Sequence, residues 1–126
     1  MTVVDEIGRS QYVSLTTYRK DGTAVATPVW HALDGGELFI ISNADAWKVK
    51  RIRNNNQVVV TVCSFRGKIA PGAPSAQGTA RVLDEAETAA ARKLIARKYV
   101  LSRLGNWFTK ALRLKKTPVV GIVVIF

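Results

Sequence analysis

Alternating apolar and polar positions predict β-strands through most of the chain. Three strands are expected to follow one another as a meander, over residues 12–18, 24–33 and 37–42. The pair Asp21-Gly22 separates the first two, and Asp34-Gly35-Gly36 separates the second from the third; such sequences are typical of tight hairpins. Three more strands are expected over residues 57–65, 76–83 and 119–126.

Helical spacing interrupts this alternation in two places before residue 100. Asp45 is well placed to cap a helix of about nine residues that ends in the asparagine run at 54–56. Asp84, followed three residues later by Glu87, resembles a capping box and predicts an alanine-rich helix after it. A short helix is also expected at the N-terminus.

A basic amphipathic helix is expected over residues 100–116. Its apolar side chains recur at helical spacing from Val100 to Leu112, with basic residues between them, and Pro118 ends it. Such a helix can lie on an anionic membrane. Packing of the same apolar stripe against the barrel or a dimer partner is the favoured interpretation.

The order of elements predicts one mainly β domain over residues 1–126, a six-stranded antiparallel barrel with flanking helices. The hairpin turns are too short for the crossovers that a parallel sheet needs. A chain of 126 residues with 48% hydrophobic residues can bury a single core.

Charge and composition restrict the partners without selecting one. The net charge of +10 favours polyanions, anionic cofactors or acidic membrane surfaces. No apolar run approaches the roughly 20 residues that span a bilayer, and the N-terminus lacks the pattern of a signal peptide, so a cytoplasmic protein is expected. Cys63, the single cysteine, lies in an apolar run and is expected to be a buried thiol.

Several kinds of enzyme are disfavoured by the residues available. The carboxylates fall at predicted turns and helix starts, so no pair is placed for hydrolysis, and no catalytic side chain is assigned. One histidine and one remote cysteine cannot hold zinc, so no metal site is expected. No G-x-S-x-G is present. His31 is expected to be a hydrogen-bonded strand residue, on the face opposite Trp30.

Two segments are the candidate binding residues. In Thr27-Pro28-Val29-Trp30, a proline inside a strand indicates an edge or a bulge, and the backbone groups beside it could address the edge of a planar heterocycle. On the helix after Asp45, Trp47, Lys48 and Arg51 are expected on one face, with Lys50 beside them. Near the start of this helix, where Ser42 and Asn43 add donors, the dipole favours an anion.

Together, the segments 12–33, 37–42, 47–62 and 78–83 resemble the pyridoxamine 5'-phosphate oxidase-like split β-barrel superfamily, and most of all its small F420-dependent oxidoreductases. The resemblance rests on a strand, a D-G turn, T-P-V-W, a second strand and K-x-x-R-x-R-N-type basic helix. Trp47 stands before the lysine where many relatives have Gly or Ser.

The resemblance implies an oxidoreductase that transfers a hydride between its cofactor and a small organic substrate. It implies a homodimer with the cofactor sites at the subunit interface. Lys48, Lys50 and Arg51 would contact the cofactor phosphate beside Ser42 and Asn43, and Thr27 to Trp30 would line the ring. Arg66, Lys68, Gln77 and Gly78 would lie near a cofactor, including that of the partner subunit.

The cofactor expected from the resemblance is F420, with FMN as the close alternative. A non-enzymatic basic barrel that binds nucleic acid through its charge is the alternative from another class. Nucleic acid is not the expected partner, because the aromatic residues are not interleaved with cations along one strand face.

Overall fold

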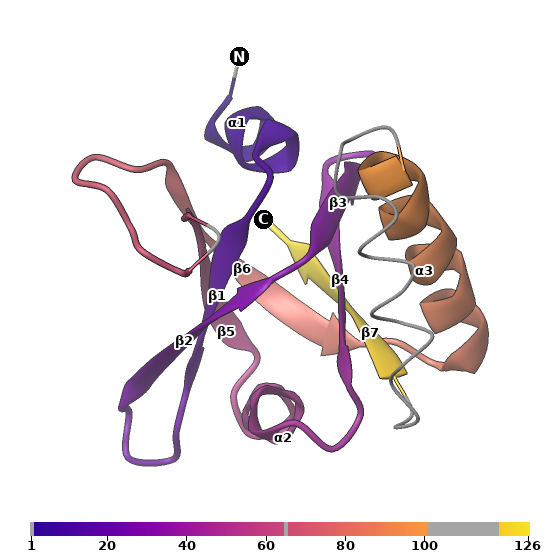
Figure 1. Cartoon of the computed structure of the whole chain (residues 1–126). Helices are drawn as coiled ribbons and strands as arrows, with labels where there is room; N and C mark the ends of the chain where they lie inside the picture. Colours follow the sequence, from indigo (N-terminus) through magenta and orange to yellow (C-terminus); the bar gives the residue numbers. More distant parts are fainter. Residues whose placement is uncertain (1, 65, 101–118) are drawn as a thin grey trace.

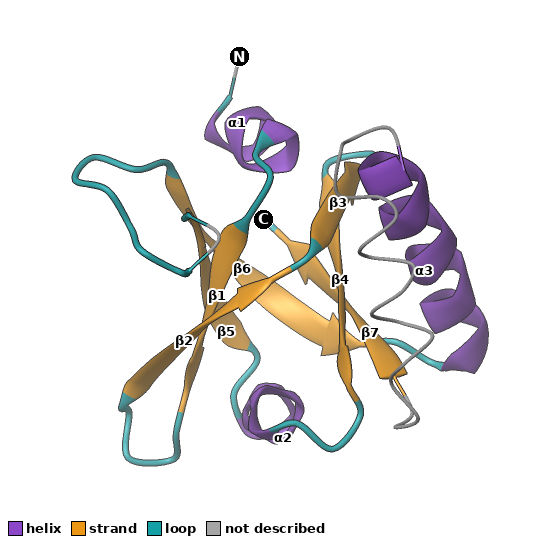
Figure 2. Cartoon of the chain, in the orientation of Figure 1, coloured by secondary structure: helices purple, strands orange, loops and turns teal. Residues whose placement is uncertain are grey.

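One antiparallel sheet of seven strands forms the body of the protein (Figures 1 and 2). The computed structural model describes residues 2–64, 66–100 and 119–126. The strands are β1 (Val13–Tyr18), β2 (Ala24–Val29), β3 (His31–Asp34), β4 (Glu37–Asn43), β5 (Gln57–Val62), β6 (Ser75–Val82) and β7 (Val119–Ile125). The helices are α1 (Val3–Arg9), α2 (Trp47–Asn54) and α3 (Glu85–Val100).

The fold class is the expected mainly β, antiparallel one, but the strand count is seven rather than six. The predicted strand over residues 24–33 is interrupted at Trp30, so that β2 pairs with β1 and β3 pairs with β4. These two strands stand at opposite ends of the strand order β2-β1-β5-β6-β7-β4-β3. A single residue joins the two ends, so the sheet has to roll up into a split barrel.

The barrel interior is apolar, and helices cover its ends and one outer face. Strand residues such as Leu15, Leu38 and Val60 are fully buried in the main core. One helix closes each end: α1 contributes the buried Ile7, and α2 contributes Val49 and Ile52 (Figure 2). On the outside, α3 packs against β4 and β7.

The two predicted helix caps have different outcomes. The Asp84 capping box is present: the Glu87 backbone N–H donates to Asp84 Oδ1 over 2.7 Å, and the Asp84 N–H donates to the Glu87 carboxylate. The prediction that Asp45 caps α2 is wrong. The N-cap of α2 is Ala46, one residue later, and no side chain caps it; the Ala46 N–H instead bonds to the Asn43 carbonyl oxygen over 3.1 Å.

The basic amphipathic helix expected over residues 100–116 lies outside the described residues, except for Val100, which ends α3. Among the helices that the structure describes, none is long and apolar enough to cross a membrane.

Candidate functional site

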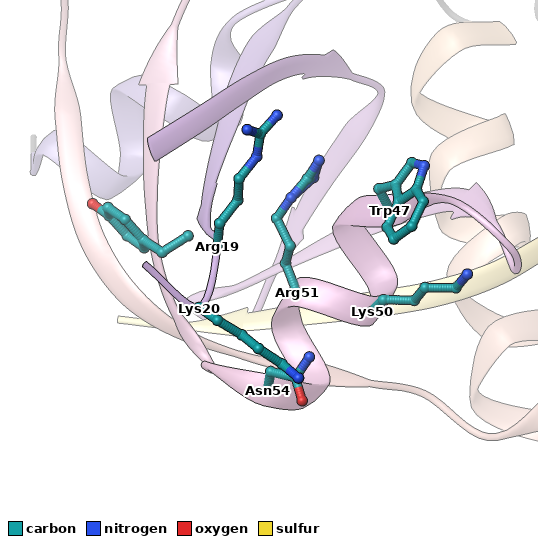
Figure 3. Close-up of a pocket in the computed structure, with 7 residues that line it drawn as sticks. Arg19, Lys20, Trp47, Lys50, Arg51 and Asn54 are labelled. Atoms are coloured by element: carbon teal, nitrogen blue, oxygen red, sulfur yellow. The ribbon is translucent and has the colours of Figure 1, made fainter. Parts of the chain in front are cut away.

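A pocket of about 410 Å³ lies between the tip of the β1–β2 hairpin and α2 (Figure 3). It is lined by Tyr18, Arg19, Lys20, Trp47, Lys50, Arg51 and Asn54. Four of these seven described residues are cations and none is a carboxylate. Within the described part of the chain, none of the four cations forms an ion pair. Their positive charge therefore remains available to attract an anion. We call this pocket the cationic pocket.

One face of α2 forms the helical wall of the cationic pocket. Trp47, Lys50, Arg51 and Asn54 follow the i, i+3, i+4, i+7 spacing that brings side chains onto one helix face. Val49 and Ile52, between them in sequence, are buried in the core. The predicted basic helix is therefore present, with Val49 and Ile52 on its packed face as expected, and Lys50 lines the pocket together with Trp47 and Arg51. Lys48 is half-buried and lies outside the pocket lining.

The side chain of Trp47 is 70% exposed, and the Lys50 ammonium lies over its ring. The distance from Lys50 Nζ to the ring centroid is 4.5 Å, within the range of a cation–π interaction. The ring is thus a wall of the pocket and holds one of the cations in place.

The second wall of the cationic pocket, at the tip of the β1–β2 hairpin, was not predicted from the sequence. The turn is closed by backbone bonds from the Arg19 N–H to the Thr23 carbonyl and from the Gly22 N–H to the Arg19 carbonyl, both 2.9 Å. Gly22 takes a φ of +87°, which favours glycine. The Asp-Gly pair did predict this turn, but only the folded chain shows that Arg19 and Lys20 lie opposite α2.

Two strands that contact each other, β2 and β4, have partly unpaired edges. Among the described strands, β2 pairs only with β1, and residues 41–43 of β4 pair only with β7. Both edges carry predicted site residues, Thr27 on one and Ser42 with Asn43 on the other. The Thr27 hydroxyl oxygen and Asn43 Oδ1 are buried and have no hydrogen-bond partner among the described residues. Buried polar atoms are normally paired, so these two atoms fit a bound polar ligand.

Pro28 lies on the edge strand β2, as its lack of an N–H predicts. The loop that carries Arg66 and Lys68 passes over it, since a Cβ atom on Gly67 would lie 3.6 Å from the Pro28 ring. Val29 is buried in the main core. Trp30 packs instead with the cluster of Ala32 and Ile95 on the α3 side. None of these residues belongs to the lining of the cationic pocket.

Gln77 and Gly78 lie on β6, away from the cationic pocket lining. Gln77 is exposed and lines a second hollow of about 320 Å³ that shares Tyr18 with the cationic pocket. Gly78 has a packing role, because a Cβ atom there would lie 2.6 Å from Val124 Cγ1. This is the close approach that a glycine inside a strand indicates. Their contact with a cofactor remains a prediction.

His31 is fully buried beneath α1, on the face opposite Trp30 as predicted. Its Nε2 lies 2.9 Å from the Ile7 carbonyl oxygen and 3.0 Å from Lys98 Nζ. Burial, together with the nearby Lys98 charge, lowers the pKa of His31 to about 3. The ring is therefore neutral and inaccessible, which confirms a structural histidine.

Lys98 ties α3 to the end of α1. Its ammonium donates to the carbonyl oxygens of Gly8 and Ser10, over 3.1 and 2.8 Å. Burial lowers the pKa of Lys98 to about 8. A cation at the C-terminus of α1 also suits the helix dipole.

The remaining candidates for chemistry are the Cys63 thiol and possible metal ligands. Cys63 is buried as predicted, and burial raises the pKa of its thiol. Within residues 2–64, 66–100 and 119–126, no group of three or more His, Cys, Asp or Glu side chains could hold a metal ion.

The sequence of the chain matches that of a known protein family. The sequence model of the pyridoxamine 5'-phosphate oxidase family matches residues 2–123. The chain belongs to this family. No curated protein matches the chain in sequence. The family match confirms the expected resemblance, and the split-barrel fold is also confirmed.

Solved structures of similar fold include cofactor-binding proteins. An F420 reductase is 26% identical, with 94% of this chain and 88% of that chain covered and a TM-score of 0.63. A FAD-binding protein from Mesorhizobium loti is 18% identical, with coverages of 98% and 86% and a TM-score of 0.67. A domain-swapped dimer is 18% identical, with coverages of 90% and 79% and a TM-score of 0.61. Family and fold together support flavin-related oxidoreduction or flavin binding.

Proposed function

We propose that this protein is an oxidoreductase that binds the deazaflavin F420, with FMN as the alternative, and transfers a hydride to a small organic substrate. The observation that carries the proposal is the cationic pocket: four cations and two aromatic rings, on two elements of a split barrel, with no carboxylate among the described lining residues. A phosphorylated planar cofactor carries the matching groups.

The phosphate of the cofactor is proposed to lie against Lys50 and Arg51. Both side chains line the pocket, and the Arg51 guanidinium can bind two phosphate oxygens at once. Lys48 and Ser42 lie at the start of α2 and the end of β4, where the helix N-terminus adds backbone donors. These residues hold the cofactor in place and do not react.

The ring of the cofactor is proposed to lie towards Thr27. Tyr18 in the pocket stands opposite Ala24 in the β1–β2 register, and Thr27 is three residues further along β2. At about 3.3 Å per residue this separation is roughly 10 Å, within the length of a flavin. The Thr27 hydroxyl can donate to a ring carbonyl, and Asn43 Oδ1 can accept from a ring N–H.

The bound ring would supply hydride transfer, so the protein needs no nucleophile or acid–base pair of its own. What the chain contributes is anchoring of the phosphate, orientation of the ring by hydrogen bonds, and a fixed apolar barrel beneath it. This assignment agrees with the buried, neutral state of His31.

A second subunit is proposed to complete the site. Relatives of this fold include a domain-swapped dimer. The family resemblance implies that Arg66, Lys68, Gln77 and Gly78 lie near a cofactor. These residues lie outside the lining of the cationic pocket. In a homodimer they would approach the cofactor of the partner subunit.

Titration of the purified protein with F420 and with FMN, followed by absorbance, tests the proposal. We expect saturable binding of F420, tighter than that of FMN. If neither cofactor binds with a dissociation constant below roughly 100 µM, a value typical of weak association, the proposed function is wrong.

A further inference from the structure

Lys50 and Arg51 are adjacent in the sequence of α2, but their side chains extend in different directions. Figure 3 shows the Arg51 side chain extending upwards from the helix, to the left of Trp47, and the Lys50 side chain extending to the right. The Lys50 ammonium lies over the Trp47 indole, with its nitrogen 4.5 Å from the ring centroid. In this structure the indole therefore holds Lys50 apart from Arg51.

The contact between Trp47 and Lys50 arises within α2 itself. The two residues are three positions apart, so their side chains are neighbours on the helix surface. The indole is 70% exposed, and the residues that α2 buries in the core are Val49 and Ile52. A substitution of Trp47 should therefore remove its contact with Lys50 and leave the packing of the helix unchanged.

A phosphate beside Arg51 would attract the Lys50 ammonium away from the indole. The ammonium is a compact charge on a flexible stem, so it can change position at little cost. Its charge-assisted hydrogen bonds to a phosphate are strong, whereas a cation–π contact at an exposed position is weak. The phosphate should therefore win Lys50, but its net gain is reduced by the contact that Lys50 gives up.

We infer that Trp47 is a positioning residue that competes with the phosphate of the ligand for Lys50. Lys50 rests on the indole in the free protein and moves beside Arg51 when a phosphorylated ligand binds. Trp47 thereby weakens the preference of the cationic pocket for a phosphorylated ligand over the same ring without a phosphate. This inference rests on the proposed function, which places the phosphate beside Lys50 and Arg51.

Dissociation constants of Trp47→Leu and Trp47→Phe, compared with those of the wild-type protein, test the inference. Leucine removes the aromatic face, and phenylalanine keeps one. The ligands are whichever of F420 and FMN binds more tightly and the same ring without its phosphate, which is riboflavin for FMN and the matching deazariboflavin for F420. Each Trp47 variant is also combined with Lys50→Gln. The matched control for that substitution is Arg53→Gln, which removes an exposed cation of α2 outside the pocket lining.

Trp47→Leu is expected to bind the phosphorylated cofactor roughly two- to fivefold more tightly than the wild type, as the loss of one exposed cation–π contact allows. Its affinity for the ring without a phosphate should stay the same. Trp47→Phe should stay close to the wild type for both ligands. The gain from leucine should vanish in the Lys50→Gln background, because no ammonium remains to be released, and should persist in the Arg53→Gln background.

Nuclear magnetic resonance gives a readout that does not depend on affinity. Protons that lie over the face of an indole resonate upfield, so the ε-methylene protons of Lys50 should be shifted upfield in the free wild-type protein. Lys50→Gln identifies their signal by its loss. Addition of the phosphorylated cofactor should move the signal to the position that it has in Trp47→Leu.

A weaker or unchanged affinity of Trp47→Leu for the phosphorylated cofactor would overturn the inference. An equal change for the ring without a phosphate, or a gain that persists in the Lys50→Gln background, would also overturn it, because the indole would then act without Lys50. These results leave the proposed function intact. If the wild-type protein binds neither F420 nor FMN, the proposed function itself fails, and the inference fails with it.

Discussion

The environment of Trp47 shows how the position of one side chain decides what a site can hold. Trp47 stands directly before the first lysine of α2, where an indole directed into the pocket would occupy the space of a phosphate. In the structure the ring is 70% exposed and lies against Lys50 at the side of the pocket. About 410 Å³ stays open beside it, so the indole narrows the pocket without filling it.

His31 and Lys98 are two titratable side chains packed against each other beneath α1. The Nε2 and Nζ atoms are 3.0 Å apart, and both groups have a lowered pKa because burial disfavours their charged forms. A protonated His31 would place a second positive charge beside the ammonium. The stability of this region should therefore depend on the protonation of the histidine.

The first prediction concerns the stability of the protein in acid. The pKa of His31 is about 3 in the folded state and near 6.5 in an unfolded chain. Between these values only the unfolded state binds the proton, so the free energy of unfolding should fall as the pH drops. The expected slope is about 1.4 kcal/mol per pH unit. Lys98 stays protonated throughout this range, because its pKa is about 8.

Denaturant unfolding at several pH values between 7 and 4 measures this slope. The variant His31→Gln removes the chain's only histidine and should show a flatter dependence, whatever its stability at pH 7. The same slope in both proteins would show that His31 does not titrate as described.

At the scale of elements, the strands could be predicted because each has its own local pattern. The alternation of apolar and polar residues, together with the Asp-Gly turn, predicted the bounds of β1, the β1–β2 turn and the bounds of β4 to within one residue. The break at Trp30 was not predicted: Pro28 indicated an edge or a bulge, but nothing in the sequence of residues 24–33 shows that the chain changes from one edge of the sheet to the other. It arises because the rolled sheet needs the chain to leave one edge and join the other, which is a property of the whole barrel.

Only one wall of the cationic pocket, the basic helix, could be predicted from the sequence, because the other wall depends on the whole fold. The basic helix stands out because its cations are clustered within a few residues. Tyr18, Arg19 and Lys20 lie about thirty residues earlier and resemble any exposed hairpin. Their place opposite α2 depends on the pairing of β1 with β5 and on the packing of α2 beneath β1.

The prediction at this scale concerns Gly78 on β6. Replacement by alanine would place Cβ 2.6 Å from Val124 Cγ1 and 3.0 Å from the Ile125 carbonyl oxygen. The backbones of β6 and β7 would have to separate, at a cost of about 1–3 kcal/mol. Chemical denaturation of Gly78→Ala should show this loss.

Thr79→Ala, at an exposed neighbouring position on the same strand, is the control and should cost a few tenths of a kcal/mol. If Gly78→Ala is as stable as the wild type but loses cofactor binding, the glycine serves the cofactor and not the packing of β7.

At the scale of the whole molecule, the net charge of +10 admits several anionic partners, nucleic acid among them. The fold narrows this choice by gathering four cations around one pocket that also has two aromatic walls. A nucleic-acid surface would instead need cations spread along a groove or strand face. The proposed function therefore requires that a phosphorylated planar cofactor lies between α2 and the β1–β2 hairpin.

A crystal structure of the protein grown with F420 tests this claim most directly. We expect density for the phosphate beside Lys50 and Arg51, with the ring extending along β2 towards Thr27. Density for the cofactor at a location that avoids α2 and the hairpin would contradict the account.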